Sequence, residues 1–171
     1  IKVSAIEKVI LFGDSLMAGY GLPNEQHLSV VLQDTLQLEG HNIEIVNGSV
    51  SGSTSAGGLN IAEWTLSEAN IDLMILCLGA NDMLRGINPK ETKNNLEKII
   101  KIAKSKNIQV VIAGMIAPTS YGYVYKKSFD KIFSDLSKKY KLQLIPFLLE
   151  GVAQKPEFNL SDGMHPNDQG T

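Results

Sequence analysis

The sequence predicts an α/β protein, a three-layer α/β/α sandwich built around a five-stranded, mainly parallel sheet. Five short apolar, β-branched runs occur along the chain, each followed by Gly, Pro, Asn or Asp, and segments of helical spacing separate them. Strands that alternate with helices pair in parallel through right-handed crossovers. The nearly continuous apolar character of the runs indicates that helices cover both faces of the sheet.

The strands and helices follow from these runs in chain order. The predicted strands are Lys8–Phe12, Ile43–Val46, Leu73–Leu78, Ile108–Ala113 and Leu142–Ile145. Apolar residues at helical spacing predict four helices between them, through Leu28, Val31, Leu32 and Leu36; Leu59, Ala62 and Leu66; Leu96, Ile99, Ile100 and Ala103; and Phe129, Ile132, Phe133 and Leu136. The single tryptophan, Trp64, is expected to pack in the core or near a helix end.

The chain of 171 residues is expected to form a single domain spanning 1–171. Its 43% hydrophobic and 20% charged residues are typical of a folded protein with a sizeable core, which excludes disorder. The last residues, Asn167-Asp168-Gln169-Gly170-Thr171, resemble a loop that enters a helix. We therefore expect a C-terminal helix that this sequence lacks.

The charge and the cysteine content of the chain limit the kinds of binding partner that it can have. The net charge is −2, and acidic and basic residues are interspersed, so nothing favours nucleic acid or an anionic membrane surface. No apolar run approaches the ~20 residues that span a bilayer, and no signal peptide is present. The single cysteine, Cys77, lies in an apolar run and is expected to be buried. The expected partner is a small-molecule substrate, and the oligomeric state stays open.

Two short polar stretches near the ends of the chain carry the elements of one catalytic unit. Ser15 follows the first strand in a Gly-Asp-Ser turn, and Asp162 and His165 lie three residues apart in a loop. A serine hydroxyl needs a histidine as base, and the imidazole needs an acid that holds its tautomer. We expect the sheet to bring these residues together, because ligand sites lie beyond the carboxyl ends of parallel strands.

Two further turns could supply donors for a developing oxyanion. Gly52 lies in a Gly/Ser-rich turn after the second strand and can present its N–H without a side chain in the way. Asn81 follows the third strand and offers an uncharged amide. With the N–H of Ser15, these groups make three donors.

Other candidates for these roles are less favoured. His27 and His41 are rival bases, but both are expected at the surface. Asp14 and Asp82 are adjacent to Ser15 and Asn81, and we expect them to have structural hydrogen-bonding roles. No HExxH or spaced His/Cys cluster indicates a metal site, and no glycine-rich nucleotide-binding fingerprint occurs.

Taken together, these residues resemble the SGNH hydrolases, also called GDSL esterases/lipases, which are named for Ser, Gly, Asn and His in four sequence blocks. The four matching blocks are Gly13-Asp14-Ser15-Leu16, Ser51-Gly52-Ser53-Thr54, Leu78-Gly79-Ala80-Asn81-Asp82 and Asp162-Gly163-Met164-His165-Pro166-Asn167. They occur in order and span nearly the whole chain. The flanking residues look closest to the bacterial branch of thioesterase I/lysophospholipase L1 and arylesterases.

The resemblance implies a flavodoxin-like sheet and a set of roles. Ser15 would be the nucleophile, His165 the general base and then acid, and Asp162 its orienting carboxylate. The N–H groups of Ser15 and Gly52 and the side chain of Asn81 would form the oxyanion hole. No cofactor is implied. In two places the chain departs from the family, with Ala80 where many relatives have Gly and Ser53 where the close branch often has Asp.

The resemblance further implies hydrolysis of a carboxylic ester, with thioesters and lysophospholipids as related substrates, through an acyl-serine intermediate. The alternatives are carbohydrate O-deacetylation or acyl transfer, and a non-catalytic acyl-binding module. Met83, Leu84, Ala117 and Pro118 are expected to bind the acyl group, with ordinary loop packing as the alternative. The family and the start at Ile1 without Met favour a periplasmic or secreted location.

Overall fold

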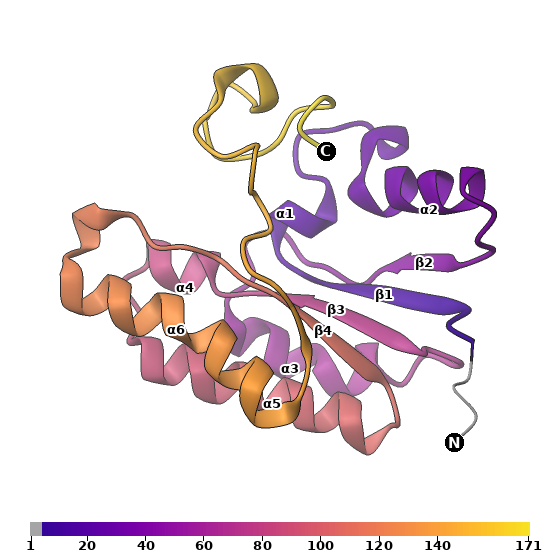
Figure 1. Cartoon of the computed structure of the whole chain (residues 1–171), viewed down its shortest axis with the longest axis horizontal. Coiled ribbons are helices and arrows are strands. Elements are labelled where there is room, and N and C mark those ends of the chain that lie inside the picture. Colours follow the sequence, from indigo (N-terminus) through magenta and orange to yellow (C-terminus); the bar gives the residue numbers. More distant parts are fainter. Residues whose placement is uncertain (1–4) are drawn as a thin grey trace.

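The five strands form one parallel sheet with the order β2-β1-β3-β4-β5, in a computed structural model that describes residues 5–171 (Figure 1). The strands are β1 (Lys8–Gly13), β2 (Glu44–Asn47), β3 (Leu73–Cys77), β4 (Gln109–Ala113) and β5 (Gln143–Ile145). Each neighbouring pair is parallel, which confirms the predicted architecture. The observed strand ends differ from the predicted ones by one residue at most.

Helices lie on both sides of this sheet. The helices are α1 (Ser15–Ala18), α2 (Leu28–Leu38), α3 (Ser55–Thr65), α4 (Ala80–Leu84), α5 (Pro89–Ser105) and α6 (Tyr123–Tyr140), and short 3₁₀ turns occupy Asn24–Gln26, Thr119–Tyr121 and Pro156–Phe158. As Figure 1 shows, α3, α5 and α6 form one layer, whereas α2 lies on the opposite face together with the C-terminal segment. The two layers therefore differ in how much of the sheet they cover.

The main core lies between the sheet and the layer of α3, α5 and α6. Phe12, Leu76 and Ile112 are in register on that face and are almost completely buried. The residues that precede Leu76 and Ile112, Ile75 and Val111, point to the opposite face of the sheet, and they are only partly buried. The helix α2 packs on β2 at the edge of the sheet, so it leaves β3 and β4 less covered.

The expectation that Trp64 packs in the core was wrong, although the residue does lie near a helix end. Trp64 lies near the end of α3 and is 82% exposed. It borders a shallow groove beside β2, together with Ile10, Val46 and Ile61. The helical pattern of α3 is satisfied by Ala62 and Leu66, which are buried, and this leaves Trp64 on the solvent side.

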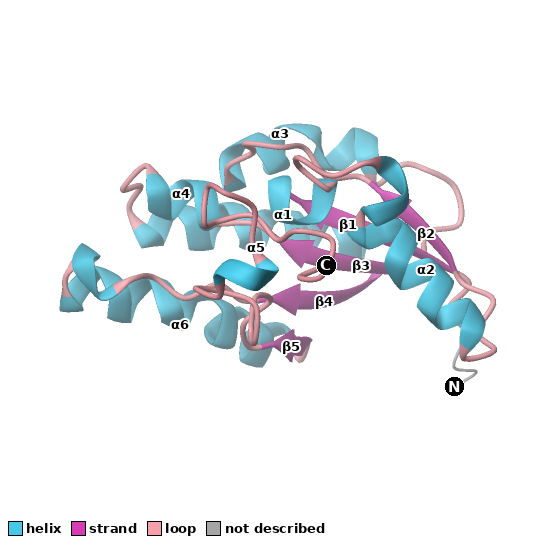
Figure 2. Ribbon diagram, turned by 90° about the horizontal axis from the view of Figure 1, so that it is seen from above, coloured by secondary structure: helices cyan, strands magenta, loops and turns pink. Residues whose placement is uncertain are grey.

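Loops that follow the strands meet at one edge of the sheet. Figure 2, the view from above, shows α1 and α4 beyond the ends of the strand arrows. The helix α1 begins two residues after β1, and α4 begins three residues after β3. Because the strands are parallel, all their carboxyl ends lie on this side, where ligand sites of such sheets occur.

Candidate active site

A tight turn after β1 presents Ser15. Gly13 ends the strand where a Cβ would lie 2.5 Å from the carbonyl oxygen of Cys77, so only glycine fits there. Asp14 caps α1, and its Oδ1 accepts the N–H of Leu16 at 3.1 Å. Ser15 is the first residue of α1, and its own N–H therefore has no intrahelical acceptor. The hydroxyl and the N–H of one residue are both available at the sheet edge.

The C-terminal loop carries His165 back to this turn. Asn159 and Pro166 form an antiparallel bridge, and the N–H of Leu160 donates to the carbonyl of His165 at 2.7 Å. Asn167 closes the loop, since its N–H donates to the carbonyl of Phe158 at 3.0 Å and its side chain donates to another carbonyl in the same segment. These backbone contacts hold the histidine although the segment lacks long regular structure.

A continuous hydrogen-bond chain joins Ser15, His165 and Asp162. The Oγ of Ser15 lies 2.8 Å from Nε2 of His165, across 150 residues of sequence. The Nδ1 of His165 lies 2.6 Å from Oδ2 of Asp162. An ionised carboxylate only accepts, so Nδ1 carries the proton and Nε2 accepts from the serine hydroxyl. This is the tautomer that a general base requires.

The carboxylate of Asp162 stays ionised because N–H groups surround it. The backbone N–H groups of His165 and Met164 donate to Oδ1 at 3.0 and 2.9 Å, and the imidazole donates to Oδ2. These hydrogen bonds, with the backbone of His165 contributing most, lower the pKa of Asp162 to about 2. On the other side of the imidazole, the ring of Tyr20 lies 4.5 Å from that of His165 between centroids. The imidazole is thus held from two sides.

The candidate oxyanion donors line the same cleft. Gly52 has a φ of +78°, a left-handed conformation that favours glycine, and its N–H donates to no acceptor within residues 5–171. The Nδ2 of Asn81 donates to the carbonyl of Ser53 at 3.1 Å and lies 3.4 Å from Oδ2 of Asp14. With Ser15, these residues place N–H groups from three loops around one opening.

A buried network fixes the loops that carry these donors. Asp82 is fully buried, and its two oxygens accept from the N–H of Ser55 at 2.7 Å and from its hydroxyl at 2.5 Å. The hydroxyl of Thr92 donates to the same carboxylate at 3.0 Å. Ser55 opens α3 just after the Gly52 turn, and Asp82 follows Asn81. The network therefore links α3, α4 and α5 behind the site.

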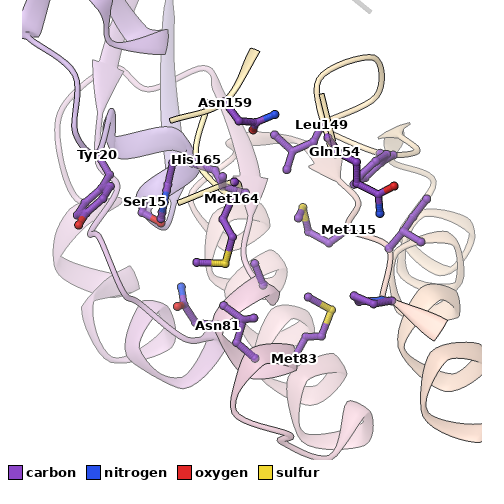
Figure 3. A pocket seen from close by; sticks show the side chains of 18 of the residues that line it. Ser15, Tyr20, Asn81, Met83, Met115, Leu149, Gln154, Asn159, Met164 and His165 are labelled. Atoms are coloured by element: carbon purple, nitrogen blue, oxygen red, sulfur yellow. The ribbon is translucent and has the colours of Figure 1, made fainter. Parts of the chain in front are cut away.

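An apolar cleft of about 630 Å³ extends from the serine. Figure 3 shows Ser15 and His165 at one end of the cleft, with Met83, Met115 and Leu149 across it and the amide of Asn81 directed toward the opening. The apolar lining is formed largely by Met83, Leu84, Met115, Ile116, Phe147 and Leu149. Such a volume and lining suit a small organic ligand with an apolar portion.

The structure brings most of the predicted acyl-binding residues to this cleft. Met83, Leu84 and Pro118 line it. Ala117 does not: its side chain is buried, and its N–H donates to Asp130 at 2.8 Å. Of the rival bases, His27 is half-buried rather than solvated as predicted, and its Nε2 lies 3.0 Å from the carbonyl oxygen of Leu22.

Several lining residues escaped the sequence interpretation. Met115 and Ile116 lie two and three residues after the end of β4, so their place after a strand was a usable signal. Phe147 and Leu149 belong to an irregular connection with no periodicity, so no local pattern could assign them to the cleft.

Residues 5–171 contain neither a candidate metal site nor a helix suited to span a membrane. Within residues 5–171 no group of three or more His, Cys, Asp or Glu side chains is placed to hold a metal ion. Over the same range no helix is long and apolar enough to cross a membrane.

A serine, an imidazole and a carboxylate in one hydrogen-bond chain, beside a group of N–H donors, form the arrangement of serine hydrolases. Comparison with known families agrees with this class. A model of the GDSL-like Lipase/Acylhydrolase family matches residues 11–171, and the chain belongs to this family. The resemblance to SGNH hydrolases is thereby confirmed.

Individual relatives extend over almost the whole chain. An arylesterase of Vibrio mimicus is 39% identical over 165 residues, which are 96% of this chain and 82% of the relative. Thioesterase 1/protease 1/lysophospholipase L1 of Escherichia coli is 32% identical over 166 residues, 97% of this chain and 78% of that protein. The crystal structure of the psychrotrophic esterase EstA from Pseudoalteromonas sp. superimposes with a TM-score of 0.90 at 31% identity, covering 95% of this chain and 89% of that one.

Proposed function

We propose that the chain hydrolyses carboxylic esters through an acyl-serine intermediate, with Ser15, His165 and Asp162 as the catalytic triad. One observation supports the proposal most directly. The Oγ of Ser15 lies 2.8 Å from Nε2 of His165, the Nδ1 of His165 lies 2.6 Å from Oδ2 of Asp162, and Ser15 and His165 line the apolar cleft. The relatives named as an arylesterase and as an esterase support the same reaction class.

Acylation begins with the serine hydroxyl. As Oγ of Ser15 attacks the ester carbonyl, Nε2 of His165 takes its proton, and the negative charge of Asp162 stabilises the resulting imidazolium. The carbonyl oxygen becomes an oxyanion and binds the N–H groups of Ser15 and Gly52 and the Nδ2 of Asn81. Collapse of this intermediate breaks the ester C–O bond, and His165 gives its proton to the leaving alkoxide.

Deacylation repeats the same steps with water. His165 removes a proton from a water molecule, the hydroxide attacks the acyl carbonyl, and the same donors bind the second oxyanion. Its collapse releases the carboxylic acid, and the proton returns from His165 to Oγ of Ser15. Both halves use only side chains and backbone groups of this chain.

The cleft favours an ester with an apolar acyl chain. Met83 and Leu84 from α4 line the cleft together with Met115 and Phe147, so an acyl chain attached to Ser15 would contact apolar side chains along its length. An acetyl group alone would leave most of the cleft empty. The length of the acyl group in the preferred substrate therefore distinguishes an esterase for long acyl chains from an O-deacetylase.

The decisive experiment is a chain-length series of p-nitrophenyl esters with wild type, Ser15→Ala and Ser105→Ala. Ser105 is an exposed serine at the end of α5 and serves as the matched control. We expect Ser15→Ala to lose about 10⁴-fold or more in kcat while Ser105→Ala keeps wild-type values. Turnover by Ser15→Ala at the wild-type rate would show that Ser15 is not the nucleophile.

The length profile tests the substrate class. We expect kcat/KM to rise from acetate to longer acyl esters. Turnover confined to acetyl esters would instead indicate an O-deacetylase, and binding of acyl esters without turnover would indicate a non-catalytic acyl-binding module. Phenylmethylsulfonyl fluoride should label Ser15, and mass spectrometry of the labelled peptide locates the adduct; labelling of another residue would contradict the mechanism.

A further inference from the structure

Asp14 is a buried ionisable group that the proposed mechanism leaves without a role. It lies between Gly13 and Ser15 and is only 1% exposed. Its Oδ1 is occupied by the N–H of Leu16, whereas its Oδ2 faces Nδ2 of Asn81 at 3.4 Å. A charged group buried this deeply needs partners, and the partner of Oδ2 is the side chain assigned to the oxyanion hole.

The orientation of the Asn81 amide depends on what surrounds it. An asparagine side chain presents an oxygen at one end and an NH₂ group at the other, and the two ends have nearly the same shape. Two acceptors face the nitrogen here, the carbonyl of Ser53 at 3.1 Å and the carboxylate of Asp14. A flipped amide would place its oxygen against both acceptors. Each of the two N–H groups therefore has an acceptor, and the hydrogen bond to Asp14, at 3.4 Å, is the longer and weaker one, which a substrate oxygen would share.

We propose that Asp14 is a positioning residue for ester hydrolysis, whose carboxylate and the Ser53 carbonyl hold the Asn81 amide with its nitrogen toward the developing oxyanion. The inference rests on the proposed function and adds to it a residue outside the triad. Asp14 touches no reacting atom and acts through Asn81.

The ionisation of Asp14 gives this role a pH dependence. Burial raises the pKa of Asp14 to about 6, although the N–H of Leu16 and the nearby imidazole of His165 act in the opposite direction. Two other titratable groups lie around Asp14. The charge of Asp82 from α4 raises the pKa of Asp14, and Cys77 from β3 has a thiol whose own pKa is raised by burial. Once protonated, the carboxyl becomes a donor that no longer disfavours the flipped amide.

The first test is a double-mutant cycle with Asp14→Asn and Asn81→Ala. An amide at position 14 keeps an acceptor for Leu16 but turns an NH₂ group toward Asn81, where two donors then face each other. We expect Asp14→Asn to lower kcat about 10- to 100-fold with little change in KM, and to lower it no further in the Asn81→Ala background. Asp34→Asn, an exposed acid on α2, is the matched control and should keep wild-type kcat.

Equal losses from Asp14→Asn in both backgrounds would overturn the proposal, because Asp14 would then act independently of Asn81. Full kcat in Asp14→Asn would overturn it as well. A general structural defect would change KM and affect both backgrounds, which separates that explanation from positioning.

A second measurement needs no variant at position 14 and no turnover. The side-chain NH₂ signals of Asn81 in a ¹H–¹⁵N spectrum, assigned by their loss in Asn81→Ala, should titrate with a midpoint near pH 6. In His165→Ala, which removes the imidazole, the titration should persist with an equal or higher midpoint. Signals that stay constant from about pH 5 to pH 8 in His165→Ala would overturn the proposal. Because this readout is independent of catalysis, it stands whether or not Ser15→Ala abolishes ester hydrolysis.

Discussion

The turn after β1 and the C-terminal loop each place an aspartate beside the catalytic pair, and the two carboxylates behave in opposite ways. Asp162 lies on an exposed loop where three N–H groups donate to it, and its pKa is lowered to about 2. Asp14 is buried beside Ser15, and its pKa is raised to about 6, mainly by burial. The number of donors and the loss of water therefore decide the charge of each group, and proximity to the serine does not.

The largest expected difference between the two regions is catalytic. Asp162→Asn removes the acceptor that fixes the His165 tautomer, and we expect kcat to fall about 10⁴-fold. Asp14→Asn should cost at most about 100-fold, since it acts only through one oxyanion donor. Steady-state kinetics with a p-nitrophenyl ester measure both. A greater loss in Asp14→Asn than in Asp162→Asn would reverse the assignment of the triad acid.

The next largest effect concerns the donor that the buried region controls. Asn81→Ala removes one of three oxyanion donors, and kcat should fall about 10²- to 10³-fold while KM changes little. The same kinetic assay, performed at saturating ester, measures the loss. A change in KM alone would show that Asn81 binds the ground state and does not stabilise the oxyanion.

A third effect is the pH dependence of stability in the buried region. The folded-state pKa of Asp14 lies above its unfolded value of 3.8, so its contribution is most favourable below about pH 3.8 and is lost as the pH rises through about 6. Relative to wild type, Asp14→Asn should therefore gain stability between about pH 4 and pH 8, by up to ~3 kcal/mol. Urea unfolding at the two pH values measures this change. A constant difference would contradict the raised pKa.

The smallest effect is expected at the exposed loop, and its sign is opposite. The pKa of Asp162 is lowered from 3.8 to about 2, so its stabilising contribution is present above about pH 3.8 and disappears as the pH falls through about 2. In Asp162→Asn, the loss of stability that comes from protonating this carboxylate in acid should be absent. Circular dichroism recorded while the pH is lowered measures the unfolding of both proteins. A variant that loses stability in acid just as wild type does would show that the loop does not hold the carboxylate ionised.

Local sequence patterns were sufficient for the five strands and the four longer helices, but they did not predict α1 and α4, the short helices that carry Ser15 and Asn81. The apolar runs around β1 and β3 are longer than any turn and are bounded by glycine, so their ends are predictable to within one residue. Trp64 shows the limit of this approach, because a residue type that is usually buried can still fall on the polar side of its helix.

In the candidate site, too, some residues could be predicted from the sequence and others could not. Ser15, Gly52, Asn81, Asp162 and His165 were identifiable because each lies in a short turn of distinctive composition, and the rule for parallel sheets places such turns at one edge. The acyl-binding residues were harder. Ala117 was expected in the cleft and points into the core, while Phe147 and Leu149 line it from a segment with no pattern.

By itself, then, the sequence determined the α/β class, the strands, the four motif-bearing loops and the chemistry that their residues can perform. These properties depend on residue type and on spacing within about ten positions. Only the tertiary structure decided that the buried carboxylate of Asp14 faces Asn81, and which side chains form the cleft. Those outcomes depend on burial and on contacts across up to 150 residues of sequence, and no local pattern records where distant loops will meet.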